Sequence, residues 1–228
     1  MKYELAANDD AENLLTSIVQ QDSDLLPKVY EGGLKTWECA LDLSNYLLTN
    51  INDFQGLTVL ELGCGTGLPG ISLMPACQVD FQDFNEQVLR IVTVPNVIAN
   101  GMESRPEDGD TVQIDPTIQS SFFAGDWRDL KHIITKKYDM VITCETIYDA
   151  GSIPALLELI QHCLVDGGVA LVAAKSFYFG CSGSLLSFLD LVRKNIPGCL
   201  IETVHVHSET VRREICRVKL RFTAPNSR

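Results

Sequence analysis

The sequence predicts an open α/β sheet, and three features support this fold class. Segments with strand and helix patterns alternate through most of the 228 residues, as in proteins whose strands are joined by helices. The apolar run Thr58–Leu62 breaks into a turn with four glycines in eight residues, and Ile71–Met74 then has the pattern of a helix start. The chain finishes on two strand-like segments that can pair antiparallel, Ile201–His207 and Cys216–Phe222. A glycine turn between a strand and a helix places backbone N–H groups at the usual ligand crevice of such a sheet.

Length and composition indicate one large domain, or one domain with an appendage. Hydrophobic residues make up 46% of the chain, which is ordinary for a protein with a full core. No apolar run approaches the roughly 20 residues that a membrane span requires. The first residues, Met1–Glu4, lack the charged and then apolar layout of a signal peptide. We therefore expect an intracellular protein with no membrane partner.

The formal charge of −12 is distributed unevenly. Residues 1–26 carry six acids and one base, whereas residues 208–228 carry six bases and two acids. An acidic surface steers basic partners toward a protein, although a solvated acidic surface needs no such partner. The same balance argues against direct binding of nucleic acid, which normally requires a basic face.

The eight cysteines and four histidines show no metal or redox pattern. No two cysteines lie within four residues of each other, so the chain has no C-x-x-C motif. We expect free thiols, mostly buried, and no metal site. Cys64 and Cys144 fall at the ends of expected strands near the ligand crevice, but no histidine is placed to activate either of them as a nucleophile.

The first 24 residues are polar and acidic, with one apolar cluster at helical spacing between Leu14 and Val19. They predict a loosely attached helix or a partly disordered lead, in front of a domain that spans 25–228. A turn-prone stretch, Pro27–Lys35, comes next. Thr36 is a fair N-cap for a helix that runs to about Asn50.

The second strand, Gln78–Gln82, ends at Asp83, which lies 20 residues beyond Gly63. A carboxylate at the tip of the second strand can accept hydrogen bonds from both hydroxyls of a ribose. Asp83 therefore indicates a ligand that contains a nucleoside, without choosing between such ligands. A helix over Asn85–Asn100 follows, interrupted at Pro95.

Residues 101–119 are polar and acidic and hold two prolines, which predicts a loop or insertion. The third strand, Ser121–Gly125, ends in Asp126 and Trp127. An indole at a strand tip can stack on an adenine, and the neighbouring carboxylate can take the exocyclic amine. Alternatively, Trp127 caps the edge of the core.

The second half of the chain continues the alternation. The fourth strand, Tyr138–Cys144, is a nearly continuous apolar run, as buried parallel strands are, and it ends in Glu145–Tyr148. The remaining elements that we expect are a helix over Ile153–Leu164 closed by Asp166–Gly168, a fifth strand over Val169–Ala174, a glycine-bearing aromatic loop over Lys175–Ser184, and a helix over Leu185–Lys194.

The spacing of the glycines narrows the choice of ligand. A dinucleotide fingerprint, G-x-G-x-x-G, needs its third glycine at the position of Leu68. The observed form is E-x-G-x-G-x-G, with Glu61 two residues before Gly63. This form resembles motif I of the S-adenosylmethionine-dependent methyltransferases with a seven-stranded sheet. In that family the acid and the glycines hold the methionine end of the cofactor. A plain nucleotide-binding turn is the alternative.

Further motifs together resemble the histidine protein methyltransferases, which modify a histidine of a large-subunit ribosomal protein. The likeness runs from about Asp24 to Phe222. That family often carries a long N-terminal extension, and only a short segment precedes the match here. The motifs that carry the likeness, besides motif I, are Pro27–Cys39, Phe81–Asn85, Pro95–Val97, Cys144–Tyr148 and Lys175-x-x-Tyr178-Phe179-Gly180.

The resemblance implies a Rossmann-like seven-stranded sheet in the order 3-2-1-4-5-7-6, with strand seven antiparallel. It also implies that Trp37 closes over the cofactor, and that the catalytic pair Glu145 and Tyr148 lies beside the substrate. The residues that we expect around S-adenosylmethionine are Trp37, Glu61, Gly63, Gly65, Gly67, Asp83, Asp126, Trp127 and Cys144.

We therefore expect a protein-histidine N-methyltransferase that acts on a basic protein, as a monomer in the cytoplasm and nucleus. A neutral imidazole already has a nucleophilic lone pair at cellular pH, so such an enzyme needs to fix a tautomer rather than supply a strong base. If Glu145 accepts the Nδ1 proton, Nε2 receives the methyl group and the product is the tele isomer. The alternatives are a lysine methyltransferase of the same fold, a non-catalytic cofactor-binding scaffold, an NAD oxidoreductase, and a Glu145 that only holds the cofactor or the loop.

Overall fold

The computed structural model describes residues 26, 29–103, 113–114, 119–208 and 211–220. The helical lead expected at 1–24 lies outside these residues. The described parts of the expected insertion at 101–119 include two short strands, β3 Met102–Glu103 and β4 Gln113–Ile114, which pair antiparallel. These strands satisfy each other's backbone hydrogen bonds, so the described part of the expected loop or insertion holds a short strand pair.

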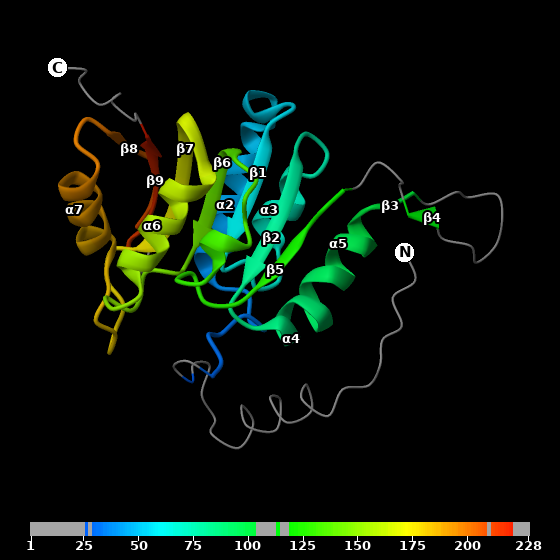
Figure 1. The fold of residues 1–228 in the computed structure, drawn as a ribbon, viewed down its shortest axis with the longest axis horizontal. Coiled ribbons are helices and arrows are strands. Elements are labelled where there is room, and N and C mark those ends of the chain that lie inside the picture. The colour runs from blue at the N-terminus through cyan, green and yellow to red at the C-terminus, as the bar shows by residue number, and fades with distance from the viewer. Residues whose placement is uncertain (1–25, 27–28, 104–112, 115–118, 209–210, 221–228) are drawn as a thin grey trace.

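Seven of the described strands form one mixed sheet in the order β5-β2-β1-β6-β7-β9-β8 (Figure 1). All neighbours are parallel except those of β9, which runs antiparallel to both β7 and β8. Numbered along the chain within this sheet, the order is 3-2-1-4-5-7-6 with the seventh strand antiparallel, so that prediction is confirmed. The strands are β1 Thr58–Leu62, β2 Gln78–Asp83, β5 Phe122–Ala124, β6 Tyr138–Cys144, β7 Leu164–Lys175, β8 Leu200–His207 and β9 Arg213–Lys219.

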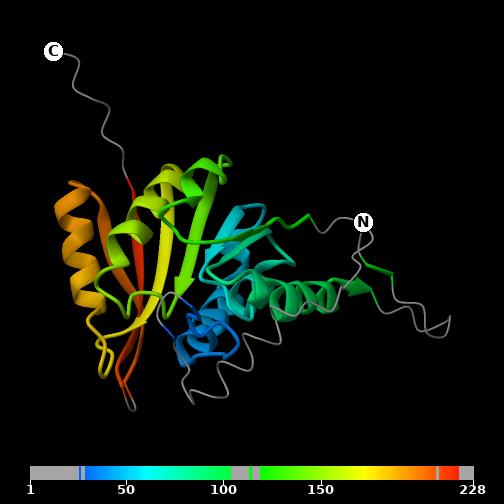
Figure 2. The same ribbon diagram turned by 60° about the horizontal axis from the view of Figure 1, so that its bottom comes forward.

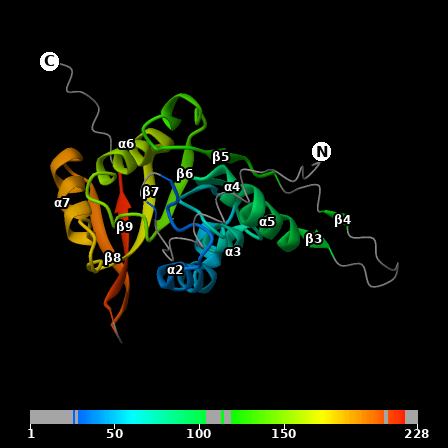
Figure 3. The same cartoon turned by 90° about the horizontal axis from the view of Figure 1, so that it is seen from below.

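Helices cover both faces of the sheet (Figure 3). In β1, Leu60 and Leu62 belong to the core under one helical layer, whereas Val59 belongs to the core under the other. Successive side chains of a strand point to opposite faces, so a strand buried on both faces reads as a continuous apolar run. The helices are α6 Ile153–Cys163 and α7 Leu185–Asn195 on the first face, and α2 Glu38–Thr49, α3 Leu68–Leu73 and α5 Val94–Asn100 on the second.

The helix predicted over Asn85–Asn100 is present, and its interruption is a π-helical segment. The short helix α4, Glu86–Val88, continues through a π segment, Leu89–Thr93, into α5, which has Pro95 in its first turn. A wider turn before the proline accommodates its ring and its missing N–H. The π segment also brings the Thr93 hydroxyl to 2.6 Å from the carbonyl oxygen of Gly65, so the interruption contacts the glycine turn.

The first helices begin at other residues than predicted. Helix α2 begins after Trp37 rather than after Thr36, and no side chain caps it. The Thr36 hydroxyl instead lies 3.2 Å from the hydroxyl of Thr66. Helix α3 begins directly after Gly67, because a proline, Pro69, is well suited to the first turn of a helix.

The boundaries of β7 and β9 also differ from the prediction. Residues Asp166–Gly168, expected to end a helix, lie inside β7, because Leu164 already pairs with Tyr138 and the register shifts before Met140 pairs with Val169. Such an irregularity inserts residues into a strand without ending it. Strand β9 begins at Arg213, where it pairs with Lys175 at the end of β7.

Candidate cofactor and acceptor site

The carboxyl ends of the parallel strands meet at one edge of the sheet. In Figure 1 the arrowheads of β2 and β6 point to this edge, where the blue segment of residues 29–37 also lies. The site has two halves. The glycine half comprises residues 61–70, 82–85 and 125–127, which follow or end β1, β2 and β5. The acid half comprises residues 145–148, 175 and 178, which follow or end β6 and β7.

The glycine turn after β1 is left-handed at three positions. The φ angle is 63° at Gly63, 51° at Gly65 and 75° at Gly67. A Cβ atom on Gly63 would lie 2.5 Å from Cγ2 of Thr146, and one on Gly65 would lie 3.0 Å from the carbonyl oxygen of Gly33. Both conformation and space therefore require glycine in this turn.

Glu61 lies beneath the first turn of α3 and is 1% exposed. Its Oε2 accepts a hydrogen bond from the N–H of Gly70 at 2.9 Å, and its Oε1 has no partner among the described residues. A Cβ atom on Gly70 would lie 2.5 Å from Oε2, so the fourth glycine of the turn makes room for this carboxyl group. Burial, with a contribution from Asp83, raises the pKa of Glu61 to about 8. The group is therefore largely protonated at neutral pH.

Asp83 ends β2 and contacts the glycine turn. Its Oδ2 accepts from the N–H of Gly65 at 2.9 Å, and its Oδ1 accepts from the N–H of Asn85 at 3.0 Å. Burial raises the pKa of Asp83 to about 6, although these N–H groups oppose the rise. Each carboxylate oxygen has a second lone pair, so Asp83 can still accept hydrogen bonds from the two hydroxyls of a ribose.

Gln82 joins the tips of β1, β2 and β5. Its Oε1 accepts from the N–H of Gly63 at 3.2 Å and from Nε1 of Trp127 at 2.9 Å, and its Nε2 donates to the carbonyl oxygen of Gly125 at 3.0 Å. Trp127 also packs against the core under α6 and α7, so it caps the core and borders the glycine turn at once. The carboxylate of Asp126 is bound by the guanidinium of Arg128.

The 29–37 segment lies against the glycine half. Asn85 donates from Nδ2 to the carbonyl oxygen of Val29 at 2.8 Å and accepts at Oδ1 from the N–H of Glu31 at 3.3 Å. Gly33 packs against Gly65. The segment ends at Trp37, whose Nε1 donates back to the carbonyl oxygen of residue 32 at 3.1 Å. The indole therefore stands between this segment and the start of α2.

Glu145 is a buried carboxylate in a strained backbone conformation at the tip of β6. Its φ of 56° is the only positive value at a non-glycine residue in the described part of the chain. Such strain costs on the order of 1–3 kcal/mol and is found mainly at functional sites. Its Oε1 accepts from the N–H of Cys39 at 3.4 Å and lies 3.6 Å from Nζ of Lys175. No described residue is a hydrogen-bond partner of its Oε2.

Lys175 connects the acid half to α2. Its Nζ lies 2.9 Å from Oε2 of Glu38, 3.6 Å from Oε1 of Glu145 and 5.6 Å from the centre of a Trp37 ring. Burial disfavours its charge, but the hydrogen bond to Glu38 and the carboxylate of Glu145 outweigh that effect and raise the pKa of Lys175. The cation therefore persists at neutral pH and balances the carboxylate of Glu145.

Two tyrosines flank Glu145. The hydroxyl of Tyr148 donates to Glu31 in the 29–37 segment. The rings of Tyr148 and Tyr178 lie edge to face, with centroids 6.4 Å apart. Burial raises the pKa of both phenols, with a further contribution from Glu31 at Tyr148 and from Glu145 at Tyr178. Both stay protonated at neutral pH. Tyr148 therefore links the acid half to the segment that lies against the glycine half.

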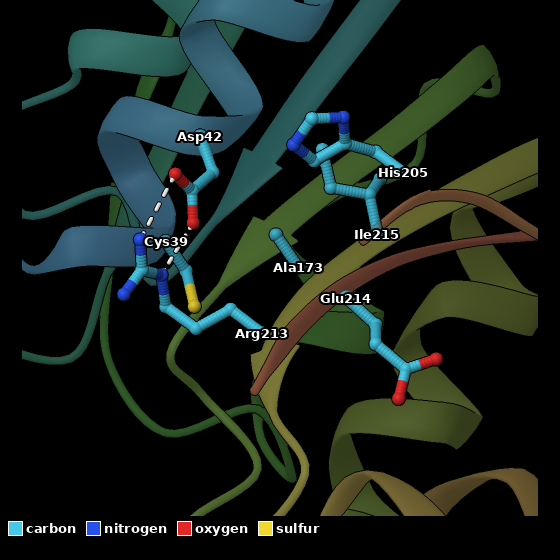
Figure 4. A pocket seen from close by; sticks show the side chains of 7 residues that line it. All are labelled: Cys39, Asp42, Ala173, His205, Arg213, Glu214 and Ile215. Atoms are coloured by element: carbon cyan, nitrogen blue, oxygen red, sulfur yellow. Dashed lines mark hydrogen bonds and ion pairs between the residues drawn. The ribbon is translucent and has the colours of Figure 1, made fainter. Parts of the chain in front are cut away.

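A small hollow lies between α2 and β9 (Figure 4). The guanidinium of Arg213 points across it to Asp42, whereas Glu214 points away. The Arg213–Asp42 pair is largely buried, with side chains 11% and 14% exposed. This pair fixes α2 against the sheet, and so fixes the N–H of Cys39 that reaches Glu145.

The cysteines and histidines contribute no metal-binding group among the described residues. All eight thiols are free; four are buried and Cys181 is exposed, so the expectation of mostly buried thiols holds for half of them. Burial raises the pKa of Cys64 and of Cys144, and neither is a thiolate at neutral pH. Separately, no described helix is long and apolar enough to cross a membrane.

Five of the residues that the structure brings to the site were not singled out from the sequence. Glu31 and Lys175 lie inside motifs that carry the family resemblance, and Gln82 and Asn85 flank Asp83, so their positions were visible but their contacts were not. Thr93 had no signal of its own, because only the π segment turns it onto the glycine turn. The five are Glu31, Gln82, Asn85, Thr93 and Lys175.

The sheet order, its single reversed strand and the glycine turn define the methyltransferase fold. The magnesium protoporphyrin IX methyltransferase of Synechocystis PCC 6803, solved with bound S-adenosylmethionine, shares this fold with a TM-score of 0.58. The match covers 96% of this chain and 87% of that one at 15% identity. A family model described as lysine methyltransferase matches residues 27–182.

Curated relatives narrow the class. The chain is 39% identical to the histidine protein methyltransferase 1 homolog of Dictyostelium discoideum, over 75% of this chain and 52% of that one. It is 31% identical to histidine protein methyltransferase 1 of Schizosaccharomyces pombe, over 99% of this chain and 76% of that one. The chain therefore belongs to the histidine protein methyltransferase family. It spans about half the length of several relatives that it matches.

Proposed function

We propose that this chain is an S-adenosylmethionine-dependent protein-histidine N-methyltransferase. The observation that carries the proposal is the carboxylate of Glu145, with one oxygen held by Lys175 and Cys39 and the other without a described partner. It lies next to the glycine turn, because Thr146, the following residue, packs against Gly63. The relatives named above support histidine as the acceptor.

The glycine half fits S-adenosylmethionine, which has a nucleoside at one end and a cationic methionine at the other. Its turn offers a cradle without Cβ atoms and, in Glu61, a buried carboxyl oxygen without a described partner. The chemistry that this group supplies when bound is an electrophilic methyl. In our proposal Asp83 binds the ribose, and Asp126 and Trp127 bind the adenine. The methionine end is bound by Glu61, Gly63, Gly65 and Gly67. Trp37 and Cys144 border the cofactor.

The acid half orients the acceptor. An imidazole with its proton on Nδ1 can donate that proton's hydrogen bond to Oε2 of Glu145, which leaves the lone pair of Nε2 free to attack. Because Lys175 and Cys39 already contact Oε1, the acceptor ring is oriented by Oε2 alone. The carboxylate also stabilises the positive charge that develops on the ring, and this stabilisation is larger in the transition state than in the bound acceptor. The product is the tele isomer.

Lysine is the second candidate acceptor, because the matching family model is described as lysine methyltransferase. A lysine side chain has a pKa of about 10.4 and must lose a proton before it attacks. Lys175 already balances Glu145, so an incoming ammonium would place a second cation on one carboxylate. A neutral imidazole avoids this repulsion, which favours histidine.

For the acceptor protein we infer a basic partner, specifically a large-subunit ribosomal protein as the family resemblance suggests. The formal charge of −12 supports a basic partner, because an acidic enzyme attracts it. Transfer should then slow as ionic strength rises. Monomeric state and location in the cytoplasm and nucleus stay predictions.

The proposal is tested by transfer of a radiolabelled methyl group from S-adenosylmethionine into a cell extract, followed by acid hydrolysis of the labelled protein. We expect the label on methylhistidine. Label on trimethyl-lysine would establish the lysine alternative. Binding of S-adenosylmethionine without any transfer would favour a non-catalytic scaffold, and binding of NAD in its place would refute the cofactor assignment.

A further inference from the structure

The loop that joins β7 to α7 carries two exposed aromatic side chains. Phe177 is 49% exposed and Phe179 is 78% exposed. Their rings lie edge to face, with centroids 4.8 Å apart and planes at 74°. Single exposed apolar residues are common, but two large rings packed on each other in the open form a continuous apolar surface, and such surfaces mark interaction sites.

This aromatic pair lies next to the acid half. Tyr178, between the two phenylalanines, is the residue that turns inward: its ring meets Tyr148, and the carboxylate of Glu145 contributes to the rise in its pKa after burial. The outer side of this short stretch therefore carries the Phe177–Phe179 pair, and its inner side faces the proposed acceptor site. In Figure 2 the loop extends from the lower edge of the sheet, the edge where the blue segment lies.

The loop is fixed at both ends. The N–H of Gly183 donates to the carbonyl oxygen of Tyr148 at 2.7 Å, and a Cβ atom there would lie 2.2 Å from the carbonyl oxygen of Ile147. At the other end, the N–H of Ser176 donates to the carbonyl oxygen of Arg212 at 2.8 Å. A surface held in place in this way loses little conformational freedom when a partner binds.

A carboxylate attached to the same loop favours a cationic partner. Asp149 is exposed and is joined to the loop, because the hydroxyl of Ser182 donates to its Oδ1 at 3.1 Å. The nearby cations are engaged: Lys175 pairs with Glu38 and Glu145, and Arg212 pairs with Glu214 at 2.8 Å. The loop therefore offers aromatic faces and a carboxylate, the combination that attracts a guanidinium or ammonium group.

We propose that the Phe177–Phe179 pair, together with Asp149, binds an arginine or lysine side chain of the acceptor polypeptide, a few residues away from the histidine that is methylated. The inference rests on the proposed function and adds the place where the acceptor's sequence is recognised. The cation stacks on the exposed phenyl face while its charge pairs with Asp149. The histidine then reaches Glu145 on the inner side of the same loop.

The test measures labelled methyl transfer into cell extract over a range of extract concentrations. Phe179→Ala, the double variant Phe177→Ala/Phe179→Ala and Asp149→Asn should raise the half-saturating concentration by about 3- to 30-fold, the range of a cation–aromatic contact. Maximal rate and the Kd for S-adenosylmethionine should stay as in the wild type. Phe179→Leu keeps the apolar bulk without the π face and should behave like Phe179→Ala, whereas Phe179→Trp should bind at least as well as the wild type.

Two controls separate the possible outcomes. Ile133→Ala removes a comparably exposed side chain, 58% exposed, outside this loop and should leave all three quantities unchanged. A short arginine-containing peptide without histidine should inhibit transfer by the wild type and inhibit Phe179→Leu several-fold less. Wild-type behaviour of the double variant, or equal inhibition of both proteins, overturns the proposal. Loss of S-adenosylmethionine affinity in these variants also overturns it, because the pair would then serve the cofactor. Absence of label on histidine with the wild type refutes the proposed function instead.

Discussion

The glycine half and the acid half of the site are built by different means. In the glycine half, backbone groups make the contacts: N–H groups of Gly63, Gly65 and Gly70 donate to Gln82, Asp83 and Glu61. In the acid half, besides the N–H of Cys39 that donates to Glu145, side chains from distant segments contact each other. Lys175 contacts Glu38 and Glu145, and Tyr148 contacts Glu31.

This difference predicts that the two halves respond differently to substitution. A carboxyl group held by backbone N–H groups belongs to a rigid pocket, so a change there should act on cofactor affinity. A carboxylate held by another side chain can be altered without disturbing the turn, so a change in the acid half should act on turnover. A variant in either half that changes both cofactor affinity and turnover would contradict this difference between the halves.

The largest effect is expected at Glu145. Glu145→Gln keeps the shape of the side chain but removes the charge that stabilises the developing imidazolium. It should lower kcat by about 10²–10⁴, the range of a positioned acid–base group, with the Kd for S-adenosylmethionine nearly unchanged by calorimetry. Tyr148→Phe should cost less. A Glu145→Gln protein that loses cofactor affinity in proportion to activity would move Glu145 to the cofactor's side of the site.

In the glycine half, Asp83→Ala and Trp127→Ala should each weaken cofactor binding by about 1–3 kcal/mol, from lost hydrogen bonds and lost stacking. At saturating cofactor their kcat should stay close to that of the wild type. Asp126→Asn should have a smaller effect, because Arg128 already shares that carboxylate. Wild-type affinity in both main variants would show that the nucleoside does not lie on the tips of β2 and β5.

Lys175 sharpens the comparison within the acid half. Lys175→Met leaves the buried carboxylate of Glu145 without its cation, and an unpaired buried group costs about 1–3 kcal/mol of stability. We expect a lower Tm and a reduced kcat with unchanged cofactor Kd. Lys175→Arg keeps the charge and should restore most of both losses. Equal Tm and kcat in the methionine and arginine variants would show that the positive charge of Lys175 does not cause these effects.

The last prediction concerns pH. The raised pKa of Glu61 means that the folded state binds the proton more tightly than the unfolded state, so its contribution to stability is complete below about pH 4.5 and is lost as pH rises through about 8. Thermal unfolding of the cofactor-free protein should therefore show a Tm that falls across this range. Glu61→Gln should flatten the fall. Glu158→Gln, at an exposed carboxylate, should not.

The glycine half could be predicted from the sequence because its determinants are local. Motif I and Asp83 follow from short-range patterns, whereas the strand order is implied by the family resemblance. The structure has the glycine turn after β1, Asp83 at the end of β2 and the expected order. The contacts of the acid half could not be predicted, because Tyr148 and Glu31 are 117 residues apart in the chain and Glu145 and Cys39 are 106 apart. The errors in the strand boundaries have the same origin. Leu164 pairs with Tyr138 and Arg213 pairs with Lys175, and these pairings extend β7 and β9 beyond their local signals.

The position of the transferred methyl group on the imidazole ring tests the central claim most directly. One carboxylate oxygen of Glu145, with the other held by Lys175, should orient every acceptor ring in the same way. Chromatography of the hydrolysed product against the two methylhistidine standards should therefore show the tele isomer alone for the wild-type protein. Label only on Nδ1 would contradict the orientation proposed for Glu145, whatever the effect of its substitution on rate.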